Sequence, residues 1–364
     1  MKKELFTAIF ILTSISIGAG VLALPYVFSQ AGFLTATLML VFMTLILLLL
    51  YFYLGEIVLR TKGRHHLAGL AEKYLGKKGK HLMFLFNSLG IYGALLAYTI
   101  GAGYALNAIY PWNQNYYSII YFLIMSIILY YGKKIFEKTE TFLSASKIIF
   151  MAIIGIILIP KINFDKIIVF DITKLHVPYG AILFSLLAIS AIPMMGEELR
   201  NKNNLKASIT YGMLLTFLIY MIFVTGMVGT SAAKEELSTT GVRGVIGLLA
   251  NLFAVFAMST AFIALGYAQK QIYMYDYLFK KFNAWTLTLI IPLALFLLDF
   301  RNFITVVEVT GSVAGGLVLL LVLIMHSRSK KLGNREPEYE IQDNIFVKSL
   351  LFLIFAIGII LLFL

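Results

Sequence analysis

Residues 13–25 read TSISIGAGVLALP and lie within the first long apolar run of the chain, residues 5–28. They place hydroxyl and small residues, then a proline, where a helix in a bilayer needs an unbroken hydrogen-bond ladder. A second apolar run contains the same kinds of residue over 184–198, which read FSLLAISAIPMMGEE. Both stretches predict helices that are interrupted inside a membrane.

The composition around these stretches excludes a water-soluble enzyme. The chain has 364 residues, of which 60% are hydrophobic and 13% charged, whereas a soluble domain averages about 45–50% apolar and about 25% charged residues. It contains no cysteine, which excludes disulfides, thiolate nucleophiles and cysteine-ligated metals.

The charges leave long apolar gaps between them. A bilayer core needs about 20 apolar helical residues. Of the 48 charged residues only Lys147, Glu308 and, two residues into the last stretch, Lys348 fall inside the candidate spans. The sequence therefore predicts an all-α polytopic membrane protein with eleven transmembrane helices. The eleven stretches are residues 5–28, 31–54, 82–110, 116–131, 141–160, 178–196, 207–229, 244–268, 284–298, 302–325 and 346–364.

The basic residues predict the orientation. With a cytoplasmic N-terminus, 23 of the 30 Lys and Arg residues lie on the cytoplasmic side and 6 on the other, as the positive-inside rule requires. We expect a multi-pass protein of the cytoplasmic membrane with its C-terminus outside. The net charge of +12 is then explained by the membrane topology, and no nucleic-acid partner is expected. The expected partner is the lipid bilayer. The polar loops, including residues 161–177, resemble interfacial segments that flank the spans.

The two interrupted helices are the first and the sixth. Blocks 5–160 and 178–325 each hold five spans, and an odd number of spans gives the blocks opposite orientations. The chain 1–364 is thus expected to be one transporter domain with two inverted repeats, followed by an extra helix at 346–364. The alternative for Ser14 and Gly18 is close helix packing, because their spacing lets two backbones approach.

Three motifs resemble the amino acid permeases. Residues 16–25, SIGAGVLALP, resemble the first helix of the amino acid/auxin permeases and of the bacterial hydroxy/aromatic amino acid permeases. Residues 97–103, AYTIGAG, and 259–266, STAFIALG, resemble helices 3 and 8 of these families. The resemblance covers the chain nearly end to end. It implies a leucine-transporter-type fold of five plus five inverted helices and a secondary amino acid transporter. The sixth helix departs from the pattern, since the positions before Pro193 where these families have a glycine-rich break hold Leu187, Ala188, Ile189 and Ser190, with no glycine and no histidine.

A broken helix meets both charges of an amino acid without a charged side chain. Free N–H groups at the start of its second half suit the carboxylate, and free carbonyls at the end of its first half suit the ammonium. Tyr98 is expected to close over the substrate; the alternative is an ordinary buried tyrosine. The expected substrate-binding residues are Ile15, Ser16, Gly18, Ala19, Gly20, Tyr98, Ser185, Ala188 and Ser190.

Lys147 is the main candidate for ion coupling, since a charged residue within a span is functional by default. In relatives of the wider superfamily, a lysine on the fifth helix replaces a sodium ion. The resemblance places Lys147 beside the carbonyls of Ser14 and Ile17 and the hydroxyls of Ser259 and Thr260. Proton coupling follows, because a buried lysine releases its proton readily. The alternatives are snorkelling of Lys147 and sodium binding by the two hydroxyls.

Two further carboxylates invite interpretation. Glu308 is either a proton acceptor, an outer-gate partner of Arg301, or a hydrogen-bonding residue next to Thr310 and Ser312. Glu56 precedes Arg60 by four residues, the spacing of an ordinary surface pair. The sequence gives no sign of a metal cluster or a cofactor.

We therefore expect a symporter, and not an enzyme, that moves a neutral amino acid with a small apolar or aromatic side chain, with protons as the coupling ion. The alternatives are a sodium-coupled symporter, a passive channel or exchanger, and a permease-like nutrient receptor that binds amino acids without transport.

Overall fold

The computed structural model describes residues 2–63, 65–131, 133–230, 233–275 and 277–363. The side chains of residues 2–3 and 133–144, whose lysines enter the charge count, lie outside the described part. The described residues form α1 (Lys2–Ser16), α2 (Ala19–Ala31), α3 (Phe33–Leu59), α4 (Leu67–Ile109), α5 (Gln114–Tyr131), α6 (Lys133–Leu158), α7 (Tyr179–Leu186), α8 (Ala191–Glu198), α9 (Asn204–Gly229), α10 (Gly244–Tyr275), α11 (Lys281–Leu297), α12 (Phe303–Val309), α13 (Gly316–Leu332) and α14 (Ile345–Ile360).

Every predicted span coincides with one of these helices or with a consecutive group of them. The first corresponds to α1 and α2, the sixth to α7 and α8, and the tenth to α12 and α13. By length and composition, six helical stretches of the described residues are able to cross a membrane, or seven with the bent pair α1–α2. Two more apolar helices, α11 and α14, are shorter. The number eleven is therefore not confirmed.

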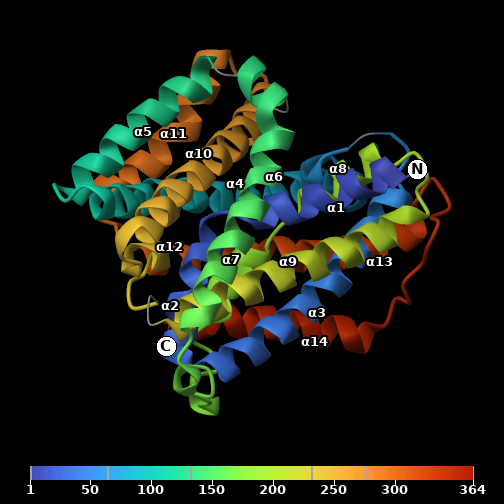
Figure 1. The fold of residues 1–364 in the computed structure, drawn as a ribbon. Coiled ribbons are helices and arrows are strands. Elements are labelled where there is room, and N and C mark those ends of the chain that lie inside the picture. Colours follow the sequence, from blue (N-terminus) through green and yellow to red (C-terminus); the bar gives the residue numbers. More distant parts are fainter. Residues whose placement is uncertain (1, 64, 132, 231–232, 276, 364) are drawn as a thin grey trace.

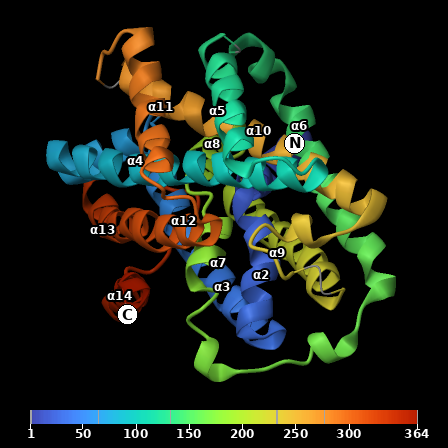
Figure 2. The ribbon, with the colours of Figure 1, turned by 90° about the vertical axis from the view of Figure 1, so that its left-hand side faces the viewer.

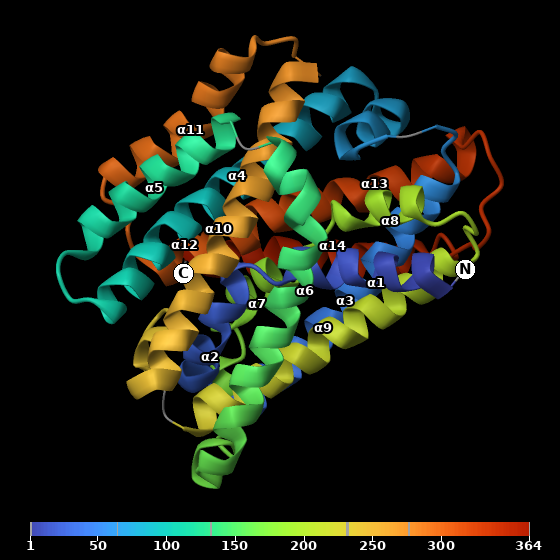
Figure 3. The ribbon, with the colours of Figure 1, turned by 45° about the horizontal axis from the view of Figure 1, so that its top comes forward.

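The helices pack in two groups. α4, α5, α10 and α11 contact one another, and α9 contacts α1, α2, α3 and α6. Figure 1 shows α5 and α11 beside each other at one edge and α3 and α9 in the other half of the molecule. Figure 2 shows the long α4 crossing the middle of the view. The start of α1 and the end of α14 lie at opposite ends of the molecule (Figures 1 and 3).

The tenth predicted span contains a π-helix, η5 (Thr310–Gly315), between α12 and α13. It packs closely on two neighbours. A Cβ added to Gly93 of α4 would lie 2.0 Å from Thr310 Oγ1, and one added to Gly311 would lie 2.2 Å from the Gly180 carbonyl oxygen of α7. Such wide turns occur frequently at functional sites.

Glu56 is not a surface residue, so the interpretation as an ordinary surface pair was wrong. Its side chain has no exposed area and accepts bonds from Arg60 Nε at 2.8 Å, Lys330 Nζ at 2.5 Å and the Ile341 N–H at 2.7 Å. His326 Nε2 lies 3.0 Å from its second oxygen. The partners come from α13 and the 333–344 segment, which closes over the end of α3.

Candidate functional site

The first helix is interrupted where its sequence predicted. α1 ends at Ser16 and α2 begins at Ala19, and the two axes differ in direction by 59°. Gly18 has φ −125° and ψ −149°, and its N–H donates to the Ser16 carbonyl. Pro25 lies inside α2 and does not end it. The first N–H groups of α2 thus have no partner within the helix, and Gly18 provides no side-chain cap for them.

The second interruption separates α7 from α8 at residues 187–190. Pro193 lies in the first turn of α8, where the absence of an N–H costs no hydrogen bond. The Ala188 N–H does not pair within the helix; it donates to Tyr51 Oη of α3 at 2.7 Å. The absence of a glycine in this stretch therefore does not prevent the helix from unwinding.

Two tyrosines hold the breaks together. Tyr220 Oη of α9 lies 2.7 Å from the carbonyl oxygens of both Ser16 and Ser185. Tyr51 donates to the Leu186 carbonyl at 2.7 Å. Both tyrosine side chains are fully buried. The two phenols thus satisfy carbonyl groups that the unwound backbone leaves without helical partners.

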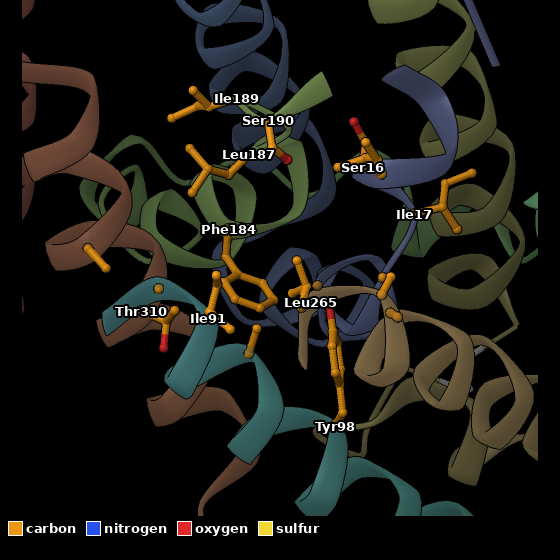
Figure 4. A pocket seen from close by; sticks show the side chains of 18 of the residues that line it. Ser16, Ile17, Ile91, Tyr98, Phe184, Leu187, Ile189, Ser190, Leu265 and Thr310 are labelled. Atoms are coloured by element: carbon orange, nitrogen blue, oxygen red, sulfur yellow. The ribbon is translucent and has the colours of Figure 1, made fainter. Parts of the chain in front are cut away.

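A cavity of about 150 Å³ lies between the two breaks. It is bounded by the first break, the second break, α4, α10 and the π-helix (Figure 4). Figure 4 shows the Tyr98 side chain of α4 with its hydroxyl pointing into the space between Phe184 and Ile17. A Cβ on Gly18 would lie 3.0 Å from this hydroxyl, so the glycine gives the phenol access to the break.

The cavity runs along α4 toward the start of this helix. On α4 its lining runs from Tyr98 back to Phe86 and Asn87, which at about 1.5 Å per residue is a depth of roughly 16 Å. This direction leads to the start of α4, the end with most of the basic residues. Beyond Tyr98 the packing is tight, since a Cβ on Gly101 would lie 2.7 Å from Met258 Sδ and 3.1 Å from the Phe303 ring.

A loop carboxylate closes the opposite end. Glu236 accepts from Asn302 Nδ2 at 2.6 Å, the Phe303 N–H at 3.1 Å and Tyr104 Oη at 3.4 Å. In the same loop, Ser238 Oγ donates to the Leu22 carbonyl of α2 at 2.7 Å. The loop thereby connects α2 to α4 and to the start of α12, on the side of Tyr98 away from Phe86 and Asn87.

Lys147 lies beside the first break. Its side chain is 5% exposed, and Nζ lies 3.3 Å from the Ser14 carbonyl oxygen and 3.4 Å from that of Ile17. These are the two carbonyls expected from the resemblance. The geometry is that of an ammonium at a helix C-terminal end, where a cation is favoured; it is not that of a side chain extended to the membrane surface.

The other coupling candidates are more dispersed. Thr260 lines the cavity, and its hydroxyl donates to the Ala257 carbonyl at 2.9 Å. Ser259 donates to Val255 at 2.7 Å and does not line the cavity. Glu308 is half-buried outside the cavity. Its proposed partner Arg301 pairs instead with Asp299 at 3.2 Å.

The cavity brings together most, but not all, of the predicted binding residues. Ala19 and Ser185 are buried and do not line it. The carbonyl of Ser185 accepts instead from Tyr220. Ala188 is also buried. A Cβ on Gly20 would lie 2.7 Å from Ser185 Cα, so at this glycine the packing interpretation applies as well. The predicted residues that line the cavity are Ser14, Ile15, Ser16, Ile17, Gly18, Gly20, Tyr98, Lys147, Ser190 and Thr260.

Sequence reasoning missed Tyr51 and Tyr220. The available signal was a phenol in the middle of an apolar span, because such a hydroxyl must find a partner inside the protein. The partner itself is not readable from the sequence.

A polytopic helical protein with two facing helix breaks around a central cavity has the architecture of a membrane permease. The sequence model of the tryptophan/tyrosine permease family matches residues 1–363. The chain therefore belongs to this family. The family consists of transporters and not of enzymes.

Two curated relatives are amino acid transporters. The chain is 23% identical over 371 residues to glutamine transporter 2 of Aliivibrio fischeri, with 95% of this chain and 94% of the relative covered. It is 23% identical over 323 residues to tyrosine-specific transport system 1 of Haemophilus influenzae, with 81% and 80% covered.

Solved structures show the same fold. The crystal structure of MhsT in complex with L-phenylalanine superposes with a TM-score of 0.64 at 15% identity, covering 98% of this chain and 97% of that one. A manganese transporter of Eremococcus coleocola, in complex with an aromatic bis-isothiourea substituted compound, gives a TM-score of 0.67 at 14% identity, with 99% and 86% covered. The fold is therefore of the leucine-transporter type.

Proposed function

We propose that the chain is a secondary active symporter that moves a neutral amino acid, with an apolar or aromatic side chain, together with a proton. It acts by alternating access across the cytoplasmic membrane, with the N-terminus inside. The observation that carries the proposal is the pair of helix breaks that face one cavity, with the Lys147 ammonium at the carbonyl end of the first break.

The main chain of the substrate fits the first break. The free N–H groups at the start of α2 and the Tyr98 hydroxyl suit a carboxylate, because a helix N-terminus favours negative charge. The ends of both broken segments, near Ile15 and Ser190, supply the polar surroundings of the ammonium. This arrangement solvates a zwitterion without a counter-charge for either group.

The remaining wall favours an uncharged side chain. It is lined by Ile91 and Ala94 of α4, Phe184 of α7, Leu187 of the second break and Leu265 of α10. Lys147 is the one charged side chain among the described lining residues. A cationic substrate side chain would lose its hydration here without an opposite charge. An anionic one would have to compete with the Ser14 and Ile17 carbonyl oxygens for the Lys147 ammonium. The aromatic permease family and the tyrosine-specific relative agree with an aromatic side chain.

Proton coupling is favoured over sodium coupling by the position of Lys147. Its ammonium contacts two carbonyl oxygens that a sodium ion would otherwise need, and Ser259 and Thr260 direct their hydroxyl protons to carbonyls of their own helix. Loss of the proton would remove the charge that the break stabilises. Protonation of Lys147 would in this way bias the arrangement of α1.

The experiment is competition for uptake of labelled tyrosine into vesicles that contain the purified protein. We expect phenylalanine and tryptophan to compete and aspartate and lysine not to compete. Competition by the charged amino acids would contradict the proposed substrate class. Binding without uptake would show a receptor in place of a transporter.

A further inference from the structure

The segment between α6 and α7 exposes large apolar side chains outside the helices. It contains three single-turn 3₁₀ helices, η1 (Ile159–Lys161), η2 (Phe164–Lys166) and η3 (Ile172–Lys174). Phe164 is 75% exposed, Ile168 67%, Phe170 53% and Ile172 58%. A water-exposed loop seldom presents so many large apolar side chains without a partner.

These side chains continue the apolar surface of a helix. The last two turns of α6 expose Ile153, Ile156 and Ile157, and the chain belongs to a family of membrane proteins. The exposed face of α6 is therefore the surface that meets lipid, and the segment follows directly from it. Because the segment continues this lipid-facing surface, we infer that the bilayer covers its apolar side chains, at the level where the acyl chains meet the headgroups.

The segment alternates its apolar side chains with exposed lysines. Lys161, Lys166 and Lys174 are all exposed, and Lys174 Nζ lies 3.7 Å from Asp171 Oδ2. Lysines extend their ammonium groups to the headgroups while their methylene chains remain in apolar surroundings. Aromatic and aliphatic residues combined with lysines are typical of segments that lie in the plane of the interface.

The other face of the segment is fixed to the protein. Ile167 and Val177 pack against the core. The Leu34 N–H donates to the Val169 carbonyl at 3.1 Å, and the Asp171 N–H donates to Thr35 Oγ1 at 2.8 Å. Figure 3 shows this green segment projecting from the bundle below α6 and α9. Its apolar face is thus held in one orientation by the start of α3.

The segment packs against the turn that joins α2, the second half of the broken helix, to α3. Gly32 connects α2 to α3 with φ +90°, and a Cβ there would lie 2.9 Å from the Val169 carbonyl oxygen. We propose that residues 162–175 form a membrane-docking surface, which inserts Phe164, Ile168, Phe170 and Ile172 into the lipid interface. Through the contacts of Val169 and Asp171, this surface sets the depth of the α2–α3 turn. The inference rests on membrane insertion and not on the proposed transport activity.

The absence of cysteine from the chain makes a direct test available. Single variants Phe164→Cys, Ile168→Cys and Phe170→Cys are spin-labelled in vesicles of phosphatidylcholine and phosphatidylglycerol. Collision rates with oxygen, which concentrates in lipid, and with a water-soluble nickel chelate are then compared. Lys166→Cys is the matched control in the same segment, and Ile153→Cys on α6 is the lipid reference.

We expect oxygen collisions to dominate at 164, 168 and 170, as at 153, and nickel collisions to dominate at 166. Dominance of nickel at 164, 168 and 170 would place the segment in water and overturn the proposal. Shielding of these labels from both reagents would show a protein partner and overturn it equally.

A second readout does not depend on the labels. With Trp112→Phe and Trp285→Phe as background, Phe170→Trp supplies a single tryptophan in the segment. Lipids brominated near the headgroup should quench its fluorescence more strongly than lipids brominated near the chain ends. Absence of quenching by both lipids would refute docking.

Discussion

Replacement of Glu56 by glutamine should destabilise the protein strongly. The carboxylate is fully buried and neutralises Arg60 and Lys330, at 2.8 Å and 2.5 Å, while it also accepts from the Ile341 N–H. Removing one partner of a buried ion pair costs about 3–5 kcal/mol, because the charge left behind loses its compensation. Here Lys330 loses it, whereas Arg60 keeps its pair with Glu340. The unfolding equilibrium constant should therefore rise by roughly two to four powers of ten, at about 1.4 kcal/mol for each tenfold change.

Equilibrium unfolding in mixed micelles, followed by circular dichroism, measures this loss. Glu72→Gln is the matched control, because Glu72 forms an exposed pair with Lys80 at 2.9 Å and should leave the midpoint unchanged. Adding Lys330→Met to Glu56→Gln should recover part of the loss, since it removes a charge that has lost its partner. A loss below about 1 kcal/mol in Glu56→Gln, the range of an exposed pair, would refute the reasoning.

Three other substitutions test the site and the packing around it. Lys147→Met should abolish pH-dependent uptake while substrate binding persists, because the ammonium at the first break is lost; proton-driven uptake that persists across several pH values would contradict this role. Tyr220→Phe should destabilise the protein by about 1–3 kcal/mol and so lower its thermal midpoint, because two buried carbonyls lose their shared donor; an unchanged midpoint would contradict this role of the hydroxyl. Gly93→Ala should destabilise the protein by about 1–3 kcal/mol, because the new Cβ would lie 2.0 Å from Thr310 Oγ1. Gly90→Ala should be tolerated, because its Cβ would lie 3.6 Å from the nearest atom, Cβ of Ala314. Equal stabilities of the two variants would refute the packing argument.

The local features of the fold were predictable from the sequence. Small, hydroxyl and proline residues marked both breaks, since these residues act on the backbone within a few positions. Every apolar stretch coincides with helix. The close approach of Lys147 to Ser14 and Ile17 was expected from the family resemblance, and the structure has it.

Long-range contacts were not predictable in the same way. Glu56 was misread because its nearest charge in sequence is Arg60, while His326, Lys330 and Ile341 approach from the other end of the chain. Tyr220 joins two breaks that are far apart in sequence. The π-helix Thr310–Gly315 makes tight contacts with Gly93 of α4 through Thr310 and with Gly180 of α7 through Gly311, and no local pattern marks it.

The central claim is that protons drive accumulation of a neutral amino acid through the cavity between the two breaks. The most direct measurement is uptake of labelled tyrosine into sodium-free vesicles that contain the purified protein, with an imposed pH gradient, acidic outside. The account predicts accumulation above the external concentration, which a protonophore collapses. Accumulation that requires sodium, or mere equilibration under the pH gradient, would contradict it.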